Sequence, residues 1–104
     1  MKYPKLISQI QTILDEKKVK DVVVLDVKDR TPFSDYYLIG TAINSRSLEA
    51  VAQSLEDFLF REEGISIKRE GTPESGWIVV DAGGVVIHVL TEEKRKLFQL
   101  ETIR

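Results

Sequence analysis

Residues 77–90 of this chain read Trp77-Ile78-Val79-Val80-Asp81-Ala82-Gly83-Gly84-Val85-Val86-Ile87-His88-Val89-Leu90. Two runs rich in β-branched residues flank a Gly-Gly pair, a pattern that predicts an antiparallel hairpin with a tight turn. With two residues in the turn, the hairpin pairs Ala82 with Val85, Asp81 with Val86, Val79 with His88 and Trp77 with Leu90. A four-residue turn keeps the same register.

The predicted register sorts the side chains of the hairpin onto two unlike faces, because neighbouring residues of a strand point to opposite sides. One face is wholly apolar and must belong to the core: Ile78, Val80, Ala82, Val85, Ile87 and Val89. The other face is mixed: Trp77, Val79, Asp81, Val86, His88 and Leu90.

Two interpretations of the mixed face remain open. In the first, a helix covers it, and Asp81 and His88 find partners beneath that helix. In the second, it is a partly exposed contact surface with Trp77 as its anchor, since aromatic residues and a low count of charges mark the centres of interfaces.

The helices around this hairpin follow from apolar residues at helical spacing. A first helix is predicted from the N-terminus to about Lys18, with Leu6, Ile10, Ile13 and Leu14 on one stripe. A second helix is predicted to begin at Asn44-Ser45, which can cap its first turn, and to end at Gly64. Thr91 predicts the cap of a helix in the C-terminal tail.

Three further strands are predicted, over residues 21–27, 36–41 and 65–68. The first is expected to be buried on both faces, because residues 22–25 are continuously apolar. Residues 70–76 are rich in turn formers and predict a loop. The order of elements predicts an α/β fold: a single domain over residues 1–104, in which a mixed sheet of about five strands has flanking helices.

The composition excludes several classes of protein. The chain has 104 residues, 42% of them apolar, a net charge of −2 and no cysteine, as expected for a small soluble domain. The lack of cysteine excludes disulfides and thiolate metal sites and is compatible with a reducing cytosol. No apolar run is long enough to cross a membrane. Without an excess of basic residues, binding along a nucleic-acid backbone is not expected as the main activity.

Few residues are candidates for catalysis or for holding a cofactor. His88 is the only histidine, so a zinc site would need carboxylate partners, and packing inside the sheet is favoured over a role as general base. The turn from Gly40 to Arg46 leads from a strand into a helix and could accept an anion, but it lacks both glycine-rich phosphate-binding patterns. A plain turn is favoured there. No catalytic, cofactor or metal residue is assigned.

The charged run of the tail, Glu92-Glu93-Lys94-Arg95-Lys96, is mixed in sign. It favours a plain solvated helix whose acidic first turn suits the helix dipole. The alternative is that Leu97, Phe98 and Leu100 form an apolar edge for a partner.

Five groups of short motifs follow one another in an order and spacing that are specific as a set. They are Ser34-Asp35-Tyr36-Tyr37-Leu38-Ile39-Gly40-Thr41, then Asn44-Ser45-Arg46, then Glu70-Gly71 with Gly76-Trp77-Ile78-Val79-Val80-Asp81, then Gly83-Gly84-Val85-Val86-Ile87-His88-Val89-Leu90, and Arg95-Lys96-Leu97-Phe98-Gln99-Leu100-Glu101. In this set, from about Leu6 onward, the chain resembles the ribosomal silencing factor family, also called RsfS or Iojap-like.

The resemblance implies a fold similar to nucleotidyltransferases but without their catalytic carboxylates, and a translation repressor that is not an enzyme and needs no cofactor. Members of this family bind the large ribosomal subunit through ribosomal protein L fourteen and sterically block association with the small subunit. The expected setting is the cytoplasm, with little direct RNA contact, no DNA and no membrane. The chain departs from the common pattern at Ala82, where an aromatic residue is usual, and at Gly84, where an acid is usual.

The mixed hairpin face and the role of the family together predict the partner-binding residues. Trp77 is expected to anchor the contact and Asp81 to supply a charge partner. The border of the contact is expected at His88, Glu92, Glu93, Phe98 and Leu100. Two alternatives stay open: a nucleotide-binding or nucleotidyltransferase-like module, suggested by the turn from Gly40 to Arg46, and a self-associating domain that forms a homodimer through the mixed face.

Overall fold

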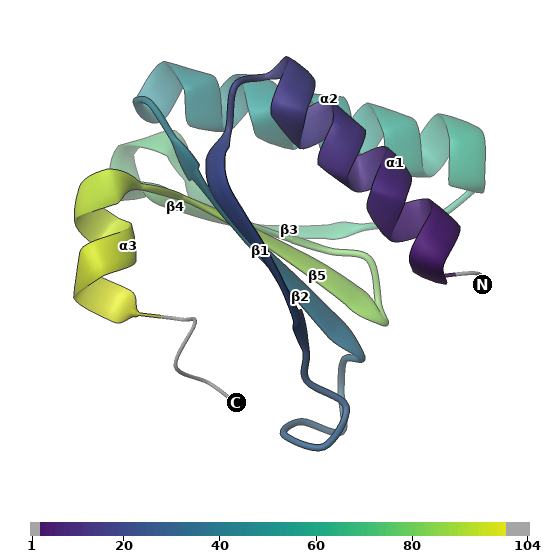
Figure 1. Ribbon diagram of the computed structural model, residues 1–104. Coiled ribbons are helices and arrows are strands. Elements are labelled where there is room, and N and C mark those ends of the chain that lie inside the picture. Colours follow the sequence, from purple (N-terminus) through teal and green to yellow (C-terminus); the bar gives the residue numbers. More distant parts are fainter. Residues whose placement is uncertain (1–2, 100–104) are drawn as a thin grey trace.

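Five strands form one sheet in the computed structural model, which describes residues 3–99 (Figure 1). The order across the sheet is β1-β2-β5-β4-β3. The strands are β1 (Lys20–Asp26), β2 (Tyr36–Ala42), β3 (Lys68–Thr72), β4 (Trp77–Asp81) and β5 (Val85–Thr91). The central pair β2 and β5 is parallel and the other three pairs are antiparallel. The predicted mixed α/β sheet is therefore confirmed.

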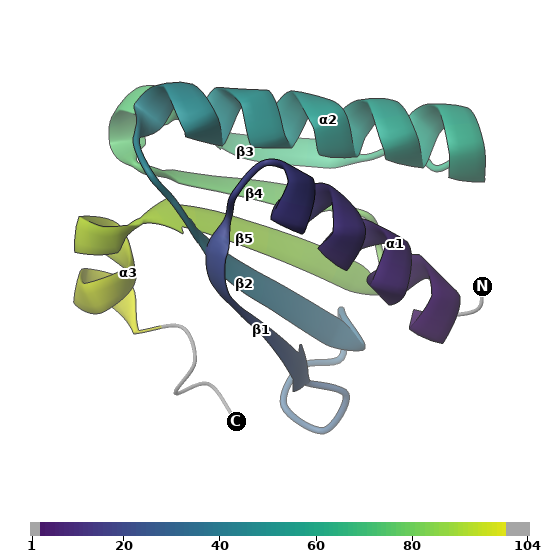
Figure 2. The ribbon, with the colours of Figure 1, turned by 45° about the horizontal axis from the view of Figure 1, so that its top comes forward.

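Two long helices, α1 (Tyr3–Glu16) and α2 (Ser45–Glu63), lie over the same face of this sheet, as Figure 2 shows. Their apolar stripes and the facing side of the sheet make the main core. A short helix, α3 (Glu92–Phe98), lies at one end of the strands, and a single 3₁₀ turn, η1 (Pro73–Ser75), precedes β4. Both long helices thus cover one face of the sheet, and neither of them covers the other face.

The register of the β4–β5 hairpin is the predicted one. Trp77 pairs with Leu90, Val79 with His88 and Asp81 with Val86. The face predicted as core is buried under α1 and α2 at every position: Ile78, Val80, Ala82, Val85, Ile87 and Val89. Ala82, one of the two departures from the family pattern, therefore lies on the helix-covered side of the sheet.

The ends of α2 are confirmed in detail. The Asn44 side chain accepts a hydrogen bond from the backbone N–H of Ser47, and Gly64 takes the left-handed conformation with φ +66°. Both caps satisfy backbone groups that a helix leaves unpaired at its ends.

The prediction for residues 65–68 was wrong in its boundaries. Ile65 and Ile67 pack against the main core, but the strand itself, β3, covers residues 68–72 and includes part of the predicted loop. Two ion pairs link this edge strand to α2: Arg69 contacts Glu56 at 2.8 Å and also Glu49. Charged residues are typical of an edge strand, and they hide it from a search for apolar alternation.

The expectation that the strand at residues 21–27 is buried on both faces was also wrong. β1 is an edge strand of the sheet, and Val24 is 37% exposed. The register shifts between Lys20 and Val23, and Asp21 there has φ +52°. The strand packs apolar residues against both sides of the sheet without a cover on its outer edge.

The last strand runs into the last helix without a loop. Thr91 ends β5, and its hydroxyl accepts a hydrogen bond from the backbone N–H of Lys94 as the cap of α3. The backbone N–H of Thr91 donates to the Gly76 carbonyl at 2.9 Å. The cap predicted at Thr91 is therefore confirmed, and it fixes where α3 begins relative to the sheet.

Candidate functional site

The sheet face opposite α1 and α2 is the candidate site, and we call it the open face. It is formed by Val23, Leu25, Tyr37, Ile39, Thr41, Trp77, Val79, Asp81, Val86, His88 and Leu90. Among residues 3–99, α3 is the helix that packs on this side, where it meets the ends of β2 and β5. The mixed face predicted for the hairpin thus extends over four strands.

A small second core lies within the open face. Leu25, Val27, Ile39 and Leu90 are buried together, and Val23, Tyr37 and Trp77 pack against them. Because the parallel pairing sets Ile39 beside His88 and Tyr37 beside Val86, residues from β1 and β2 meet the hairpin here. The face is therefore ordered by its own apolar contacts.

Trp77 and His88 form the central polar contact of the open face. The indole Nε1–H of Trp77 donates to Nδ1 of His88 at 3.2 Å. The two ring centroids are 5.9 Å apart, and the Tyr37 ring lies 4.9 Å from His88 on another side. An indole N–H can only donate, so Nδ1 is the unprotonated nitrogen and the neutral imidazole carries its proton on Nε2.

His88 is held in the neutral form. It is only 8% exposed, and burial lowers the pKa of its imidazole from 6.5 to about 4, although the nearby Asp81 carboxylate acts in the opposite direction. Its Nε2 is buried and has no hydrogen-bond partner within the described part of the chain. An unpaired buried donor costs about 1–3 kcal/mol of folding free energy, so the Nε2–H group of His88 destabilises the fold.

Trp77 is half-buried between two parts of the fold. The centroid of its ring lies 4.6 Å from that of Phe98 in α3, and Phe98 itself is 45% exposed. A shallow groove of about 340 Å³ lies at this point and is lined by Glu70, Gly71, Ser75, Trp77, Val79, Lys94 and Phe98. Trp77 and Phe98 therefore offer an accessible aromatic surface next to a groove.

Asp81 is half-buried at the turn of the hairpin. Its Oδ1 accepts a hydrogen bond from the backbone N–H of Gly83 at 2.8 Å, and Gly83 has φ +88°. The carboxylate thus stabilises the tight turn and keeps further acceptor capacity on the open face.

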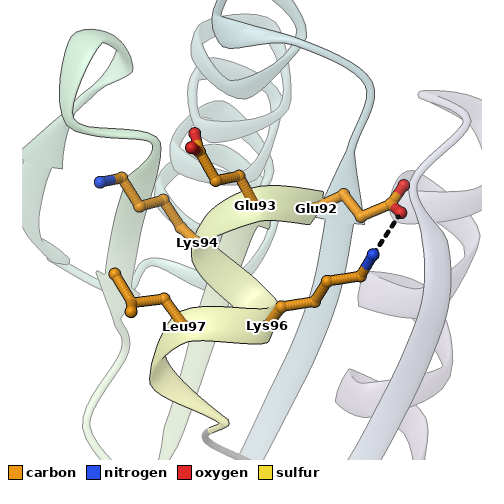
Figure 3. Close-up of a pocket in the computed structure, with 5 residues that line it drawn as sticks. All are labelled: Glu92, Glu93, Lys94, Lys96 and Leu97. Carbon is orange, nitrogen blue, oxygen red and sulfur yellow. Dashed lines mark ion pairs between the residues drawn. The ribbon is translucent and has the colours of Figure 1, made fainter.

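Glu92 and Glu93 lie in the exposed first turn of α3. Figure 3 shows that their side chains spread apart from the helix and that Glu92 points to Lys96, with which it forms an ion pair at 3.3 Å. Leu97, 66% exposed, lies on the same side of α3 as Lys94 in this view. These side chains line an open depression on the outer surface of the helix. Leu100, also predicted as a contact residue, lies outside the described residues.

The turn from Gly40 to Arg46 has a packing explanation. A Cβ atom at Gly40 would lie 2.5 Å from Cγ1 of Val19, so the position favours glycine because the side chain of Val19, just before β1, packs closely against it. The α2 N-terminus is already capped by Asn44. Among residues 3–99 there is no group of three or more His, Asp or Glu side chains that could hold a metal ion, and no helix there is long and apolar enough to span a membrane.

Comparison with known proteins identifies the family. The model of the family described as "Ribosomal silencing factor during starvation" matches residues 1–104. The ribosomal silencing factor RsfS of Bacillus subtilis is 33% identical over 90 residues, which cover 86% of this chain and 75% of the relative. This chain belongs to the RsfS family. Membership implies a ribosome-associated regulator of translation, and the family is named for silencing ribosomes and not for a reaction.

Other relatives agree with this assignment. RsfS of Haemophilus influenzae is 30% identical over 98 residues, covering 94% of this chain and 96% of that protein. The mouse protein named "Mitochondrial assembly of ribosomal large subunit protein 1" is 28% identical over 100 residues, which cover 93% of this chain and 44% of that protein. A crystal structure of a Chromobacterium violaceum protein matches with a TM-score of 0.89 and 29% identity, over 97% of this chain and 84% of that one.

Tyr37, on the open face, and Glu70, beside it, were not predicted from the sequence as site residues of this RsfS family member. The Tyr37 ring lies tilted beside His88 because β2 and β5 are parallel neighbours, and the sequence holds no direct signal of that pairing. Glu70 lies opposite Val79 in the β3–β4 ladder and lines the groove beside Trp77. The sequence predicts a loop at Glu70, because glycine, threonine and proline follow it.

Proposed function

We propose that the open face is the surface through which this RsfS family member binds the large ribosomal subunit, by contact with ribosomal protein L fourteen. The bound protein then occupies space that the small subunit needs, and translation is repressed without any chemical step. The observation that carries this proposal is an apolar sheet face, left uncovered by both long helices, with a half-buried tryptophan at one end.

The chemistry of this face supports a protein partner. Trp77 and Phe98 provide adjoining accessible aromatic surface, and a few aromatic anchors that become desolvated on binding supply most of the binding energy of many interfaces. Beside the anchor, Glu70 adds an acidic group and Lys94 adds a cation. Asp81 adds a second acidic group at the other end of β4. Such a mixed border suits a folded protein surface better than a run of phosphates.

The size of the molecule also supports a single main contact. The accessible surface is 6229 Å², and a standard contact hides about 800 Å² of each partner, which is about an eighth of it. The principal extents are 32 × 30 × 21 Å. A body of this size, seated on the subunit interface, is large enough to prevent close approach of two rigid surfaces.

Sedimentation through a sucrose gradient with purified ribosomal subunits tests the proposal. The protein is expected in the fractions of the large subunit and not in those of the small subunit, and its addition is expected to lower the share of joined ribosomes. Sedimentation with neither subunit, or with the small subunit alone, would contradict the proposal.

Trp77→Ala tests the position of the contact. Loss of an aromatic anchor is expected to weaken binding to the large subunit by more than about 1 kcal/mol. The matched control is Phe60→Ala, because Phe60 is a 68% exposed aromatic residue on α2, away from the open face. Equal binding by folded Trp77→Ala and wild type would remove Trp77 from the contact.

Binding of isolated ribosomal protein L fourteen, followed by titration calorimetry, tests the named partner. Wild type and Phe60→Ala are expected to bind it alike, and Trp77→Ala more weakly. If large subunits are bound but the isolated partner is not, another component of the subunit provides the contact.

Light scattering at several concentrations tests whether the open face pairs with its own copy, in which case added partner is expected to dissociate the dimer.

A further inference from the structure

His88 occupies an unusual position for a residue of a contact surface. It lies on the central strand β5, only 8% exposed, so it offers almost no area to a partner. It nevertheless makes a directed hydrogen bond to Trp77, whose ring is accessible. His88, which is buried at the centre of the open face, thus contacts Trp77, which a partner can reach.

The two ring neighbours of Trp77 differ in how firmly they are held. Phe98 is the last residue of the short helix α3 and is 45% exposed. His88 is fixed by ladder pairing with Val79 on one side and Ile39 on the other, and by the Tyr37 ring beside it. Of the two neighbours, His88 is therefore the one that can hold the indole ring of Trp77 in a fixed orientation.

We infer that His88 is a positioning residue for the large-subunit contact: by accepting the indole N–H at Nδ1, it fixes the orientation in which Trp77 is presented to the partner. The inference rests on the proposed function, because it concerns the same anchor. Fixing the indole before binding reduces the conformational entropy that is lost when the complex forms.

The state of the second ring nitrogen supports this role. Nε2 is buried and has no partner among residues 3–99, so the imidazole gains nothing from half of its hydrogen-bonding capacity. An apolar residue of similar size would avoid an unpaired buried donor. What distinguishes histidine from such a residue here is the acceptor at Nδ1.

Nuclear magnetic resonance of the free protein tests the hydrogen bond without the ribosome. The chain has one tryptophan, so its indole N–H gives one signal. That signal is expected downfield and protected from exchange in wild type, and upfield and unprotected in His88→Leu and in His88→Phe, which fills the ring volume without an acceptor. His88→Asn carries an acceptor near the position of Nδ1 and is expected to keep much of the shift and protection.

Binding to the large subunit tests the consequence. His88→Leu and His88→Phe are expected to bind about three- to tenfold more weakly, as for loss of one hydrogen bond, whereas His88→Asn stays within about twofold of wild type. Ile87→Val is the matched control: it removes one methylene from the opposite, helix-covered face of the same strand and is expected to change neither the indole signal nor the binding.

The outcomes separate this inference from the proposed function. If Trp77→Ala binds as wild type does, the proposed contact is wrong and the inference fails with it. If Trp77→Ala weakens binding but folded His88→Leu and His88→Phe do not, the contact stands and the positioning role is overturned. An indole signal that is unchanged in those two variants overturns the inference as well, whatever the ribosome shows.

Discussion

The charge of His88 depends on whether the chain is folded. Burial lowers the pKa of this imidazole from 6.5 to about 4 in the folded protein, whereas in the unfolded chain it titrates normally. Between these two pH values the unfolded chain binds a proton that the folded chain does not. The free energy of unfolding is therefore expected to fall by up to about 3 kcal/mol as the pH is lowered from 7 to 4, and this contribution levels off at lower pH.

Chemical denaturation at a series of pH values measures this slope, and His88→Asn is its control. Asparagine does not titrate, so its profile is expected to lack the part of the fall that lies between pH 6.5 and 5, where most carboxylates are still ionised. Parallel profiles of wild type and His88→Asn would show that the imidazole does not account for the slope.

Gly40 is expected to accept a side chain only at a cost in stability. A Cβ there would meet Cγ1 of Val19 at 2.5 Å, so Gly40→Ala is expected to lower the free energy of unfolding by about 1–3 kcal/mol. Combining it with Val19→Ala makes room, and the double variant is expected to lose less than the sum of the two single losses. Simple additivity in this cycle, measured by denaturation, would contradict the close approach.

At the level of elements, α3 is connected to the sheet by a side chain as well as by its cap. Nη1 of Arg95 donates to the backbone carbonyl of Asp21 and, at 3.0 Å, to Oγ1 of Thr41. Arg95→Leu is expected to speed hydrogen exchange of the α3 amides by about tenfold, because local opening becomes easier, while β5 stays protected. Because α3 carries Phe98, binding to the large subunit is expected to weaken too.

Lys96→Ala is the control for this experiment. It removes only the exposed ion pair with Glu92, and such pairs contribute about 0.3–0.5 kcal/mol. Exchange in α3 is therefore expected to change by no more than about twofold. Equal acceleration in the two variants would mean that Arg95 does not secure the helix.

A helix or strand could be predicted where the residues that determine it lie within its own stretch of sequence. The α2 helix carries its start, stripe and stop in its own sequence, and the hairpin carries its register in the Gly83-Gly84 turn. β3 has no such signal, because its place is set by pairing with β4 and by the ion pairs of Arg69. β1 looked doubly buried because composition does not show whether a strand lies at an edge.

The residues of the candidate site differ in the same respect: some are placed by nearby sequence and others by contacts between distant parts of the chain. Trp77, Asp81 and His88 were placed on one face because a single turn determines their register. Tyr37 reaches this face through a parallel pairing across a long crossover. Phe98 was predicted at the border of the contact, but its place against Trp77 depends on the direction in which α3 leaves the sheet. Neither is a local property of the sequence. That His88 accepts from Trp77 depends on rotamers, which alternation alone does not determine.

At the scale of the whole molecule, the charge balance predicts how binding responds to salt. The chain has a net charge of −2, and a contact made mainly with protein neutralises few phosphates. Raising the salt from about 50 to 200 mM is therefore expected to weaken binding to the large subunit by less than about tenfold, against about 10³–10⁵ for proteins with 6–10 phosphate contacts. Sedimentation at several salt concentrations measures this dependence, and a steep one would indicate RNA as the main partner.

The direct junction of β5 and α3 has a consequence for what the chain can change. Thr91 closes the strand and caps the helix, so no residue in between can absorb an insertion. One added residue would turn α3 by about 100° about its axis and shift it by about 1.5 Å, which would carry Phe98 away from Trp77. The directions in which α3 presents its side chains thus depend on where β5 ends. This junction is therefore expected to accept substitutions but no insertion or deletion.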